Sequence, residues 1–276
     1  MPLLIVKSCL VIMALTRNVI CRTQSRSPTK VSTPVHWPIS SSKSLCSISP
    51  TSSTSWDQLS SPSGDEVKED STSYWEDVRF IAISGKRKCG KDYVATFLRN
   101  EIQERLGQTA AIIHISEPIK RAFAEEHHLD LQELMSSSAY KEHFRRHMVR
   151  WGEALRRKDT TIFCRKALEY LIQDSPFKPA FVIVADCRRP TDLEYFSSLN
   201  KETPFLHLRI LASPVTRGAR GWIYKSGIDD AETECALDKT PFDVLVVNES
   251  QRTLTLSMAV VRRALGDNPP RKMMTI

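Results

Sequence analysis

The fold of this chain is decided by the stretch FIAISGKRKCGKD, residues 80–92. Its first four residues are apolar and rich in branched side chains, which is typical of a buried strand. Gly85 and Gly90 follow five residues apart, and Lys91 opens a helical pattern. Glycines let the backbone wrap closely enough for successive N–H groups to face one anion, and the start of the helix adds its positive end. The spacing therefore predicts a strand, a phosphate-binding loop and a helix in succession.

One position of this loop departs from the general motif. Asp92 stands where Ser or Thr normally places a hydroxyl on Mg²⁺, and a carboxylate there reaches the metal directly or through water.

The loop also carries three consecutive cations. Lys86, Arg87 and Lys88 repel one another unless an anion lies among them. The alternative interpretation is a tight basic turn that is solvated and binds no phosphate. We predict that the loop binds nucleotide phosphates through Gly85, Lys86, Arg87, Lys88, Cys89, Gly90, Lys91 and Asp92.

The composition is that of a globular protein with anionic partners. The chain has 276 residues, 41% of them hydrophobic, a net charge of +7 and a pI near 9.1. The positive net charge suggests an anionic partner, which could be nucleic acid, a membrane surface or phosphorylated metabolites. Because the cations cluster with glycines and carboxylates and lack interleaved aromatic residues, we expect small phosphates and no nucleic acid. Seven scattered cysteines argue against a zinc site or a disulfide framework, and no uninterrupted apolar stretch is long enough for a membrane span.

The N-terminal part differs from the rest of the chain. After a mostly apolar beginning it is rich in Ser, Thr and Pro, and it has no acidic residue before Asp57. An acid-poor, Ser-rich, basic N-terminus is typical of an organellar targeting segment. The alternative is a disordered extension, because the segment has few apolar side chains to bury. We expect a disordered or targeting extension over 1–76, a folded domain over 77–268 with a lid at about 213–236, and a tail over 269–276.

Five short apolar runs, separated mostly by helical patterns, predict a parallel sheet that helices cover on both faces. The runs are 80–83, 110–115, 181–185, 206–211 and 244–247, and the first helix extends from 91 to 107. In such sheets, ligands bind at the carboxyl ends of the strands. The residues that follow each run are therefore the candidates for a site.

The third run ends in a charged sequence, with Asp186 followed by Arg188 and Arg189. In phosphate-loop proteins a carboxylate at this place commonly belongs to the Mg²⁺ shell, and adjacent arginines bind phosphate through two hydrogen bonds each. Alternatively, Asp186 caps the helix that begins near Pro190.

Other charged candidates lie on a helix and in a loop. Lys141 and Arg145 are four residues apart, so a helix places both on one face. Either an anion lies opposite this pair, or the face is a solvated basic one that Glu142 and Glu153 compensate. Arg217 and Arg220 alternate with glycines before an acidic cluster. This pattern indicates either a mobile flap that closes over the reacting group or a flexible surface loop. Asn248, after the last run, lies where a base or substrate meets the sheet edge.

Several ordered motifs together resemble one family, the animal phosphomevalonate kinases. The motifs are GKRKCGKD at 85–92, YKE at 140–142, RWGE at 150–153, FCRK at 163–166, DCRR at 186–189, RGW at 220–222 and DDAETEC at 229–235. The resemblance covers about residues 79–250. In this family the loop ends in Gly-Lys-Asp, so Asp92 fits the family pattern. Cys89 stands where we expect serine, which leaves a backbone contact but removes a hydroxyl.

The resemblance implies an α/β fold of the phosphate-loop NTP hydrolase class, like that of nucleoside monophosphate kinases, with a mobile lid. It also implies transfer of the γ-phosphoryl group of ATP, with Mg²⁺, to (R)-5-phosphomevalonate, in isoprenoid and sterol synthesis. The products are ADP and 5-diphosphomevalonate, and the enzyme is expected to be a cytosolic monomer with small-molecule substrates. The alternatives are a kinase of the same fold for a nucleotide or dephospho-coenzyme A, and a noncatalytic nucleotide-binding module.

Because the acceptor phosphate is already an anion at neutral pH, the expected chemistry needs no general base. Catalysis then consists of alignment and charge neutralisation. We assign Lys91 and the loop amides to the β and γ phosphates, and Asp92 and Asp186 to Mg²⁺. Arg220, helped by Arg217, is the closing cation. The substrate is assigned to Lys120, Lys141, Arg145, Arg188 and Arg189, and Asn248 to both nucleotide and substrate.

Overall fold

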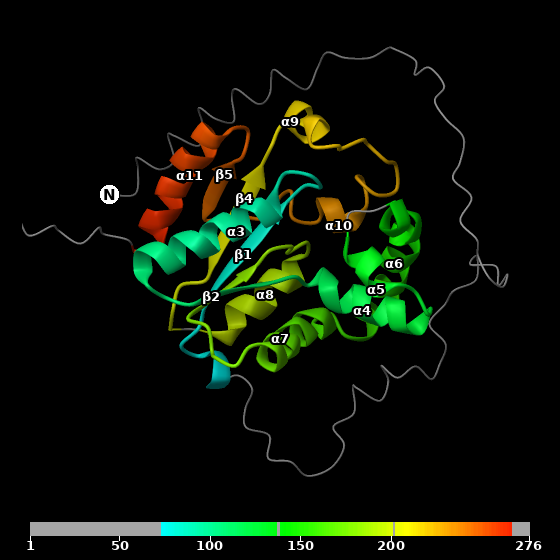
Figure 1. Cartoon of the computed structure of the whole chain (residues 1–276), viewed down its shortest axis with the longest axis horizontal. Helices are drawn as coiled ribbons and strands as arrows, with labels where there is room; N and C mark the ends of the chain where they lie inside the picture. Colours follow the sequence, from blue (N-terminus) through cyan, green and yellow to red (C-terminus); the bar gives the residue numbers. More distant parts are fainter. Residues whose placement is uncertain (1–72, 137–138, 201, 267–276) are drawn as a thin grey trace, which may run out of the picture. The chain divides into compact units, whose positions relative to one another are not determined.

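The computed structural model describes residues 73–136, 139–200 and 202–266 (Figure 1). The predicted tail and residues 1–72 of the predicted extension lie outside the described residues. Trp75, which the sequence assigned to the extension, forms part of a short 3-10 helix (Ser73–Trp75) and is buried. Its ring packs against Phe80 with the centroids 5.8 Å apart, so the packed part of the chain begins before residue 77.

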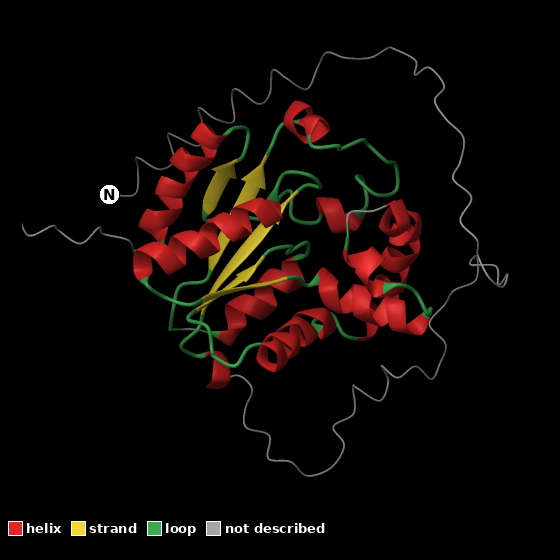
Figure 2. Cartoon of the chain, in the orientation of Figure 1, coloured by secondary structure: helices red, strands yellow, loops and turns green. Residues whose placement is uncertain are grey.

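The five predicted apolar runs form one parallel sheet, which confirms the expected architecture (Figure 2). The strands are β1 (Arg79–Gly85), β2 (Ala110–Ile113), β3 (Phe181–Val184), β4 (Leu206–Leu211) and β5 (Val244–Val247). Their order is β2-β3-β1-β4-β5, with Ile81 of the central strand opposite Ile183 and Leu206. The strand after residue 110 ends earlier than predicted. The backbone turns there because Ile115 already caps the next helix.

The helices are α3 (Lys91–Glu101), continued by a π-helical turn (Ile102–Leu106), α4 (Ser116–Glu126), α5 (Leu131–Met135), α6 (Ala139–Lys158), α7 (Ile162–Asp174), α8 (Pro190–Leu199), α9 (Pro214–Ala219), α10 (Glu232–Cys235) and α11 (Gln251–Ala264). Alternate residues of β1 point to opposite faces of the sheet. Ile81 and Ile83 therefore join the core that α3 and α11 cover, while Phe80 packs against Phe196 of α8. Both faces of the sheet are buried, as a parallel sheet requires.

The parallel arrangement brings the ends of all five strands to one edge. The phosphate loop follows β1, His114 and α4 follow β2, and Asp186 follows β3. The segment with α9 follows β4, and Asn248 follows β5. This edge lies toward α6 and α10 in Figure 1. The sequence thus places its candidate residues at the position where ligands bind in such sheets.

Candidate active site

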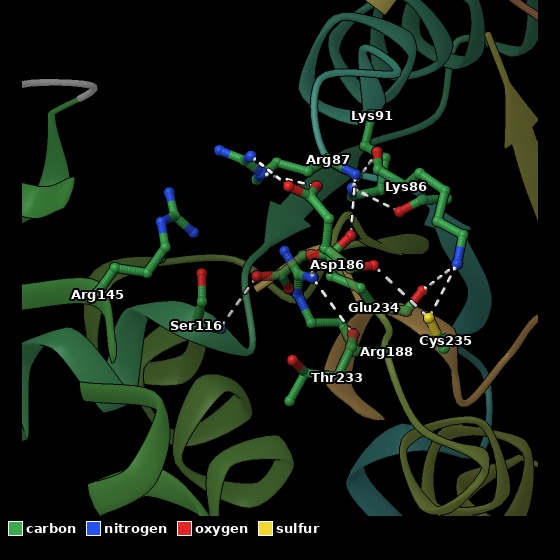
Figure 3. Close-up of polar contacts among 12 residues, drawn as sticks. Lys86, Arg87, Lys91, Ser116, Arg145, Asp186, Arg188, Thr233, Glu234 and Cys235 are labelled. Atoms are coloured by element: carbon green, nitrogen blue, oxygen red, sulfur yellow. Dashed lines mark hydrogen bonds and ion pairs between the residues drawn. The ribbon is translucent and has the colours of Figure 1, made fainter. Parts of the chain in front are cut away.

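A cleft of about 1010 Å³ lies at this edge, between the phosphate loop, α6 and the segment that carries α10. Most of the predicted site residues line it. They are Arg87, Lys88, Gly90, Lys91, Asp92, Lys120, Lys141, Arg145, Asp186, Arg188, Arg189 and Arg220. Five predicted residues do not line it, namely Gly85, Lys86, Cys89, Arg217 and Asn248. Figure 3 shows the part of the cleft where the loop, Asp186 and Arg188 come together.

Lys91 is the first residue of α3, and its ammonium group folds back over the loop. Nζ donates to the carbonyl oxygen of Gly85 at 2.8 Å and to that of Lys86 at 3.3 Å. The side chain is therefore held at the concave side of the turn by its own loop. An anion that the loop amides bind would lie next to this ammonium, which is the arrangement that a phosphate-binding loop needs.

The loop is held by two side chains that the sequence had assigned to ligands. The carbonyl oxygen of Cys89 accepts hydrogen bonds from Asn248 Nδ2 and from Arg220 Nη1, both at 2.9 Å. Gly90 has a φ of 89°, and a Cβ added there would lie 2.4 Å from Asn248 Nδ2. Asn248 is thus buried behind the loop and does not face the cleft. The Cys89 side chain is also buried, in the core beside Gly85, so no group at this position points toward a ligand.

Asp186 follows β3, and its carboxylate lies at the start of α4. Its Oδ1 accepts the N–H of Ile115 at 2.7 Å and its Oδ2 that of Ser116 at 3.1 Å. Burial opposes the charge, but the nearby charges of His114, Arg188 and Lys120 and the side chain of Ser116 outweigh burial and lower the pKa of Asp186. Asp186 therefore does not cap the helix that begins at Pro190, and Asp192 has that role. Asp92, in contrast, is exposed, with Oδ1 3.9 Å from His114 Nδ1.

Helices α4 and α6 supply a second group of cations. Burial, together with the nearby charges of Lys120 and Arg145, lowers the pKa of Lys141 to about 8. Burial likewise lowers the pKa of Lys120. Arg145 donates to Glu142 Oε1 from Nε at 2.9 Å and from Nη2 at 2.6 Å. Three cations that repel one another thus share one side of the cleft, and a multiply charged anion there would relieve this repulsion.

The two arginines after β3 are paired with carboxylates. Arg188 Nη1 forms an ion pair with Glu234, and Arg189 forms one with Glu153 of α6. Glu234 also accepts the backbone N–H of Arg87 at 3.0 Å, so it joins the phosphate loop to Arg188 (Figure 3). The carboxylate of Glu234 therefore lies between the loop and one of the predicted substrate cations.

The segment 220–236 is docked on the loop through further charged groups. Arg87 Nη2 lies 2.7 Å from Asp229 Oδ2, and Trp222 Nε1 donates to Asp229 Oδ1 at 2.8 Å. Arg217 lies over the Trp222 ring at 4.0 Å and donates from Nε to the carbonyl oxygen of Arg87 at 2.8 Å. Lys86 points away from the cleft, to Asp238 at 2.6 Å. Asp229 of this segment and Asp238 beyond it thus pair with Arg87 and Lys86 of the loop.

Comparison of the sequence with known proteins identifies the family of this chain. The sequence model of the phosphomevalonate kinase family matches residues 83–202. Phosphomevalonate kinase of Drosophila melanogaster is 39% identical over 178 residues, which are 63% of this chain and 90% of the relative. The chain belongs to the phosphomevalonate kinase family. As a member of the phosphomevalonate kinase family it is a kinase.

Solved structures of similar proteins have lower sequence identity. Shikimate kinase from Acinetobacter baumannii, in complex with shikimate, is 11% identical, with a TM-score of 0.39 over 71% of this chain and 98% of that one. A gluconokinase from Sinorhizobium meliloti is 12% identical, with a TM-score of 0.38 over 69% of this chain and 97% of that one. None of the helices in the described part of this family member is long and apolar enough to cross a membrane.

Sequence reasoning missed the carboxylates that organise the site of this phosphomevalonate kinase family member. The acidic cluster at 229–234 was visible, but it was expected to accompany cations that close over a ligand. In the structure Asp229 and Glu234 themselves bind the loop and Arg188. Glu142 stands beside a predicted substrate lysine and binds Lys225 at 2.9 Å. Its place next to two predicted cations is the signal that could have identified it.

Proposed function

We propose that this chain transfers the γ-phosphoryl group of ATP to (R)-5-phosphomevalonate and releases ADP and 5-diphosphomevalonate, a step of isoprenoid and sterol synthesis. The observation that carries the proposal is the match along 90% of a phosphomevalonate kinase. The cleft supports it, because a phosphate loop and a separate group of cations face one space. Such a space accommodates two polyanions end to end, as phosphoryl transfer requires.

On the donor side, we assign the β and γ phosphates to the loop amides and Lys91. Arg220 lines the cleft and is held by the carbonyl oxygens of Cys89 and Asn248, so its charge lies beside the loop. There it stabilises the charge that develops on the transferred group. Arg217 and Asn248 support the loop from outside the cleft. We propose that the lid is the segment at about 213–236, within a kinase domain that begins before residue 77, where Trp75 is already packed, and extends to about 268.

On the acceptor side, we assign the phosphate of phosphomevalonate to the cations that line the opposite wall. These are Lys120, Lys141, Arg145, Arg188 and Arg189. A phosphate monoester is largely a dianion at neutral pH, since its second pKa is about 6. Its oxygen attacks without losing a proton, so the protein has to align two anions and neutralise them.

We also propose that the cleft holds a magnesium ion. Mg²⁺ in kinases is held by one or two carboxylates together with substrate phosphates and water. Asp92 and Asp186 provide two carboxylates in the same cleft, and among the described residues no cluster of three or more metal-binding side chains occurs. When bound, the ion would neutralise charge on the phosphates of ATP. Asp92→Asn is expected to raise the Mg²⁺ concentration that half-maximal turnover requires.

We further propose that the chain acts as a monomer in the cytosol. Sedimentation at micromolar concentration tests the first point, with a single species of 31.4 kDa or its processed form expected. Mass spectrometry of the protein isolated from cells tests the second. An intact N-terminus supports a cytosolic extension, whereas loss of most of residues 1–72 would indicate targeting.

The decisive experiment is an ADP-release assay with a panel of acceptors. We expect rapid release of ADP with phosphomevalonate and little with nucleoside monophosphates, dephospho-coenzyme A or water. Rapid release with one of the other acceptors instead would assign a different kinase activity. No release with any acceptor, together with salt-sensitive binding to oligonucleotides, would indicate a noncatalytic binding protein.

A further inference from the structure

Asp192 is a fully buried carboxylate at the base of the cleft, and the proposed chemistry gives it no role. Its Oδ2 accepts the backbone N–H groups of Arg188 at 2.9 Å and Arg189 at 3.1 Å. Its Oδ1 accepts Arg156 Nη1 at 3.0 Å and lies 3.7 Å from the sulfur of Cys164. Each carboxylate oxygen therefore binds a different part of the fold.

The first oxygen fixes the turn between β3 and α8. Two consecutive N–H groups that share one acceptor leave the backbone of this turn little freedom. The side chains of Arg188 and Arg189 consequently leave the turn in defined directions, one toward Glu234 and the other toward Glu153. Both guanidinium groups line the cleft.

The second oxygen reaches α6 through Arg156. This arginine is itself held in place, because its guanidinium lies 5.1 Å from the centre of the Phe163 ring and Nη1 also donates to the carbonyl oxygen of Thr160 at 3.3 Å. The same helix carries Lys141 and Arg145. The Asp192 carboxylate is thus a buried connection between the turn and α6.

A helix cap alone does not account for this arrangement. A cap needs one oxygen for the N–H groups of the first turn, and it works at exposed positions. The second oxygen of Asp192 has an arginine of another helix as its partner, at a depth where an unpaired charge is strongly unfavourable. Relative movement of the turn and α6 would therefore have to break a buried ion pair.

We propose that Asp192 is a positioning residue for the acceptor phosphate, because it holds the turn with two arginines at a fixed place relative to α6. The proposal rests on the proposed function, in which both elements bind the acceptor. According to the proposal, Asp192 sets the distance between the two arginines of the turn, Arg188 and Arg189, and the cations of α6. A fixed spacing lets both groups bind one phosphate at once without reorganisation.

Asp192→Asn tests the proposal with little change in volume. The amide oxygen still accepts the two backbone N–H groups, but the amide NH₂ then faces the Nη1 donor of Arg156 and the ion pair is lost. We expect the KM for phosphomevalonate to rise about tenfold or more while the KM for ATP stays within about twofold. Cys164→Ala, the control, removes only the thiol next to the same carboxylate and leaves both constants within about twofold.

Other outcomes overturn the proposal. An unchanged KM for phosphomevalonate contradicts it, whether or not thermal stability falls, because a purely structural cap would behave in this way. An equal rise of both KM values contradicts it as well. If Asp192→Asn does not fold, Asp192→Ser replaces it. The serine hydroxyl accepts an N–H but does not reach Arg156. The KM for phosphomevalonate is again expected to rise while the KM for ATP stays unchanged. A wild-type chain that is inactive on phosphomevalonate refutes the proposed function itself, so the two failures are distinguishable.

Discussion

Arg87 of the phosphate loop and Asp229 of the proposed lid form a buried ion pair, with Nη2 2.7 Å from Oδ2 and Nε 3.2 Å from Oδ1. The two side chains are only 10% and 6% exposed. Although burial favours protonation, hydrogen bonds from Arg87, Trp222 and the Lys225 N–H lower the pKa of Asp229 to about 2. The pair therefore remains charged at any ordinary pH and joins the lid to the loop.

Replacing Asp229 by alanine should release the lid. The change leaves the Arg87 guanidinium buried without its main partner, which costs about 3–5 kcal/mol when the second charge stays in place. We expect faster hydrogen exchange over residues 222–232 and unchanged exchange in the sheet. Asp230→Ala is the control, because the partners of Asp230 among the described residues, Gly227, Tyr224 and Ser226, all lie within its own loop. Equal exchange in both variants would show that the pair does not hold the lid.

Lys91→Met should abolish most of the turnover. The ammonium lies over the loop carbonyls, where it would neutralise the transferred group, and the thioether has similar length but no charge. We expect turnover to fall by at least about 100-fold with the thermal midpoint nearly unchanged. Lys178→Met, at a surface lysine 3.5 Å from Asp77, is the matched control and should keep full activity. Near-normal turnover of Lys91→Met would refute the role of this lysine.

Gly90→Ala should weaken ATP binding, because the loop has no room for a side chain there. The positive φ of 89° disfavours alanine, and the new Cβ would lie 2.4 Å from Asn248 Nδ2. The loop must then lose the bond between Asn248 and Cys89, so we expect the KM for ATP to rise about tenfold or more. In Gly218→Ala, a Cβ meets no atom within 4 Å, and α9 favours alanine. An equal KM for ATP in both variants would contradict this account.

The sequence was sufficient to predict the sheet and the edge where the candidates meet. The apolar runs and the glycine spacing are local signals, and the parallel topology then brings the ends of separate strands together. Pairing between charges is not local. Whether Arg188 binds Glu234 depends on the path of the lid in space, which composition does not determine. Asn248 was placed at the correct edge, but the sequence could not tell that its side chain points behind Gly90.

Binding of phosphomevalonate should weaken as the pH rises above about 8. Burial, with the nearby charges of Lys120 and Arg145, lowers the pKa of Lys141 from 10.5 to about 8, so the empty protein loses this proton well before an exposed lysine would. A bound dianion favours the protonated form, and the KM should therefore rise up to about tenfold per pH unit between pH 8 and 10. The KM for ATP should stay flat over this range. Lys141→Arg keeps its charge and should remove the dependence. If this variant shows the same rise, another group causes it.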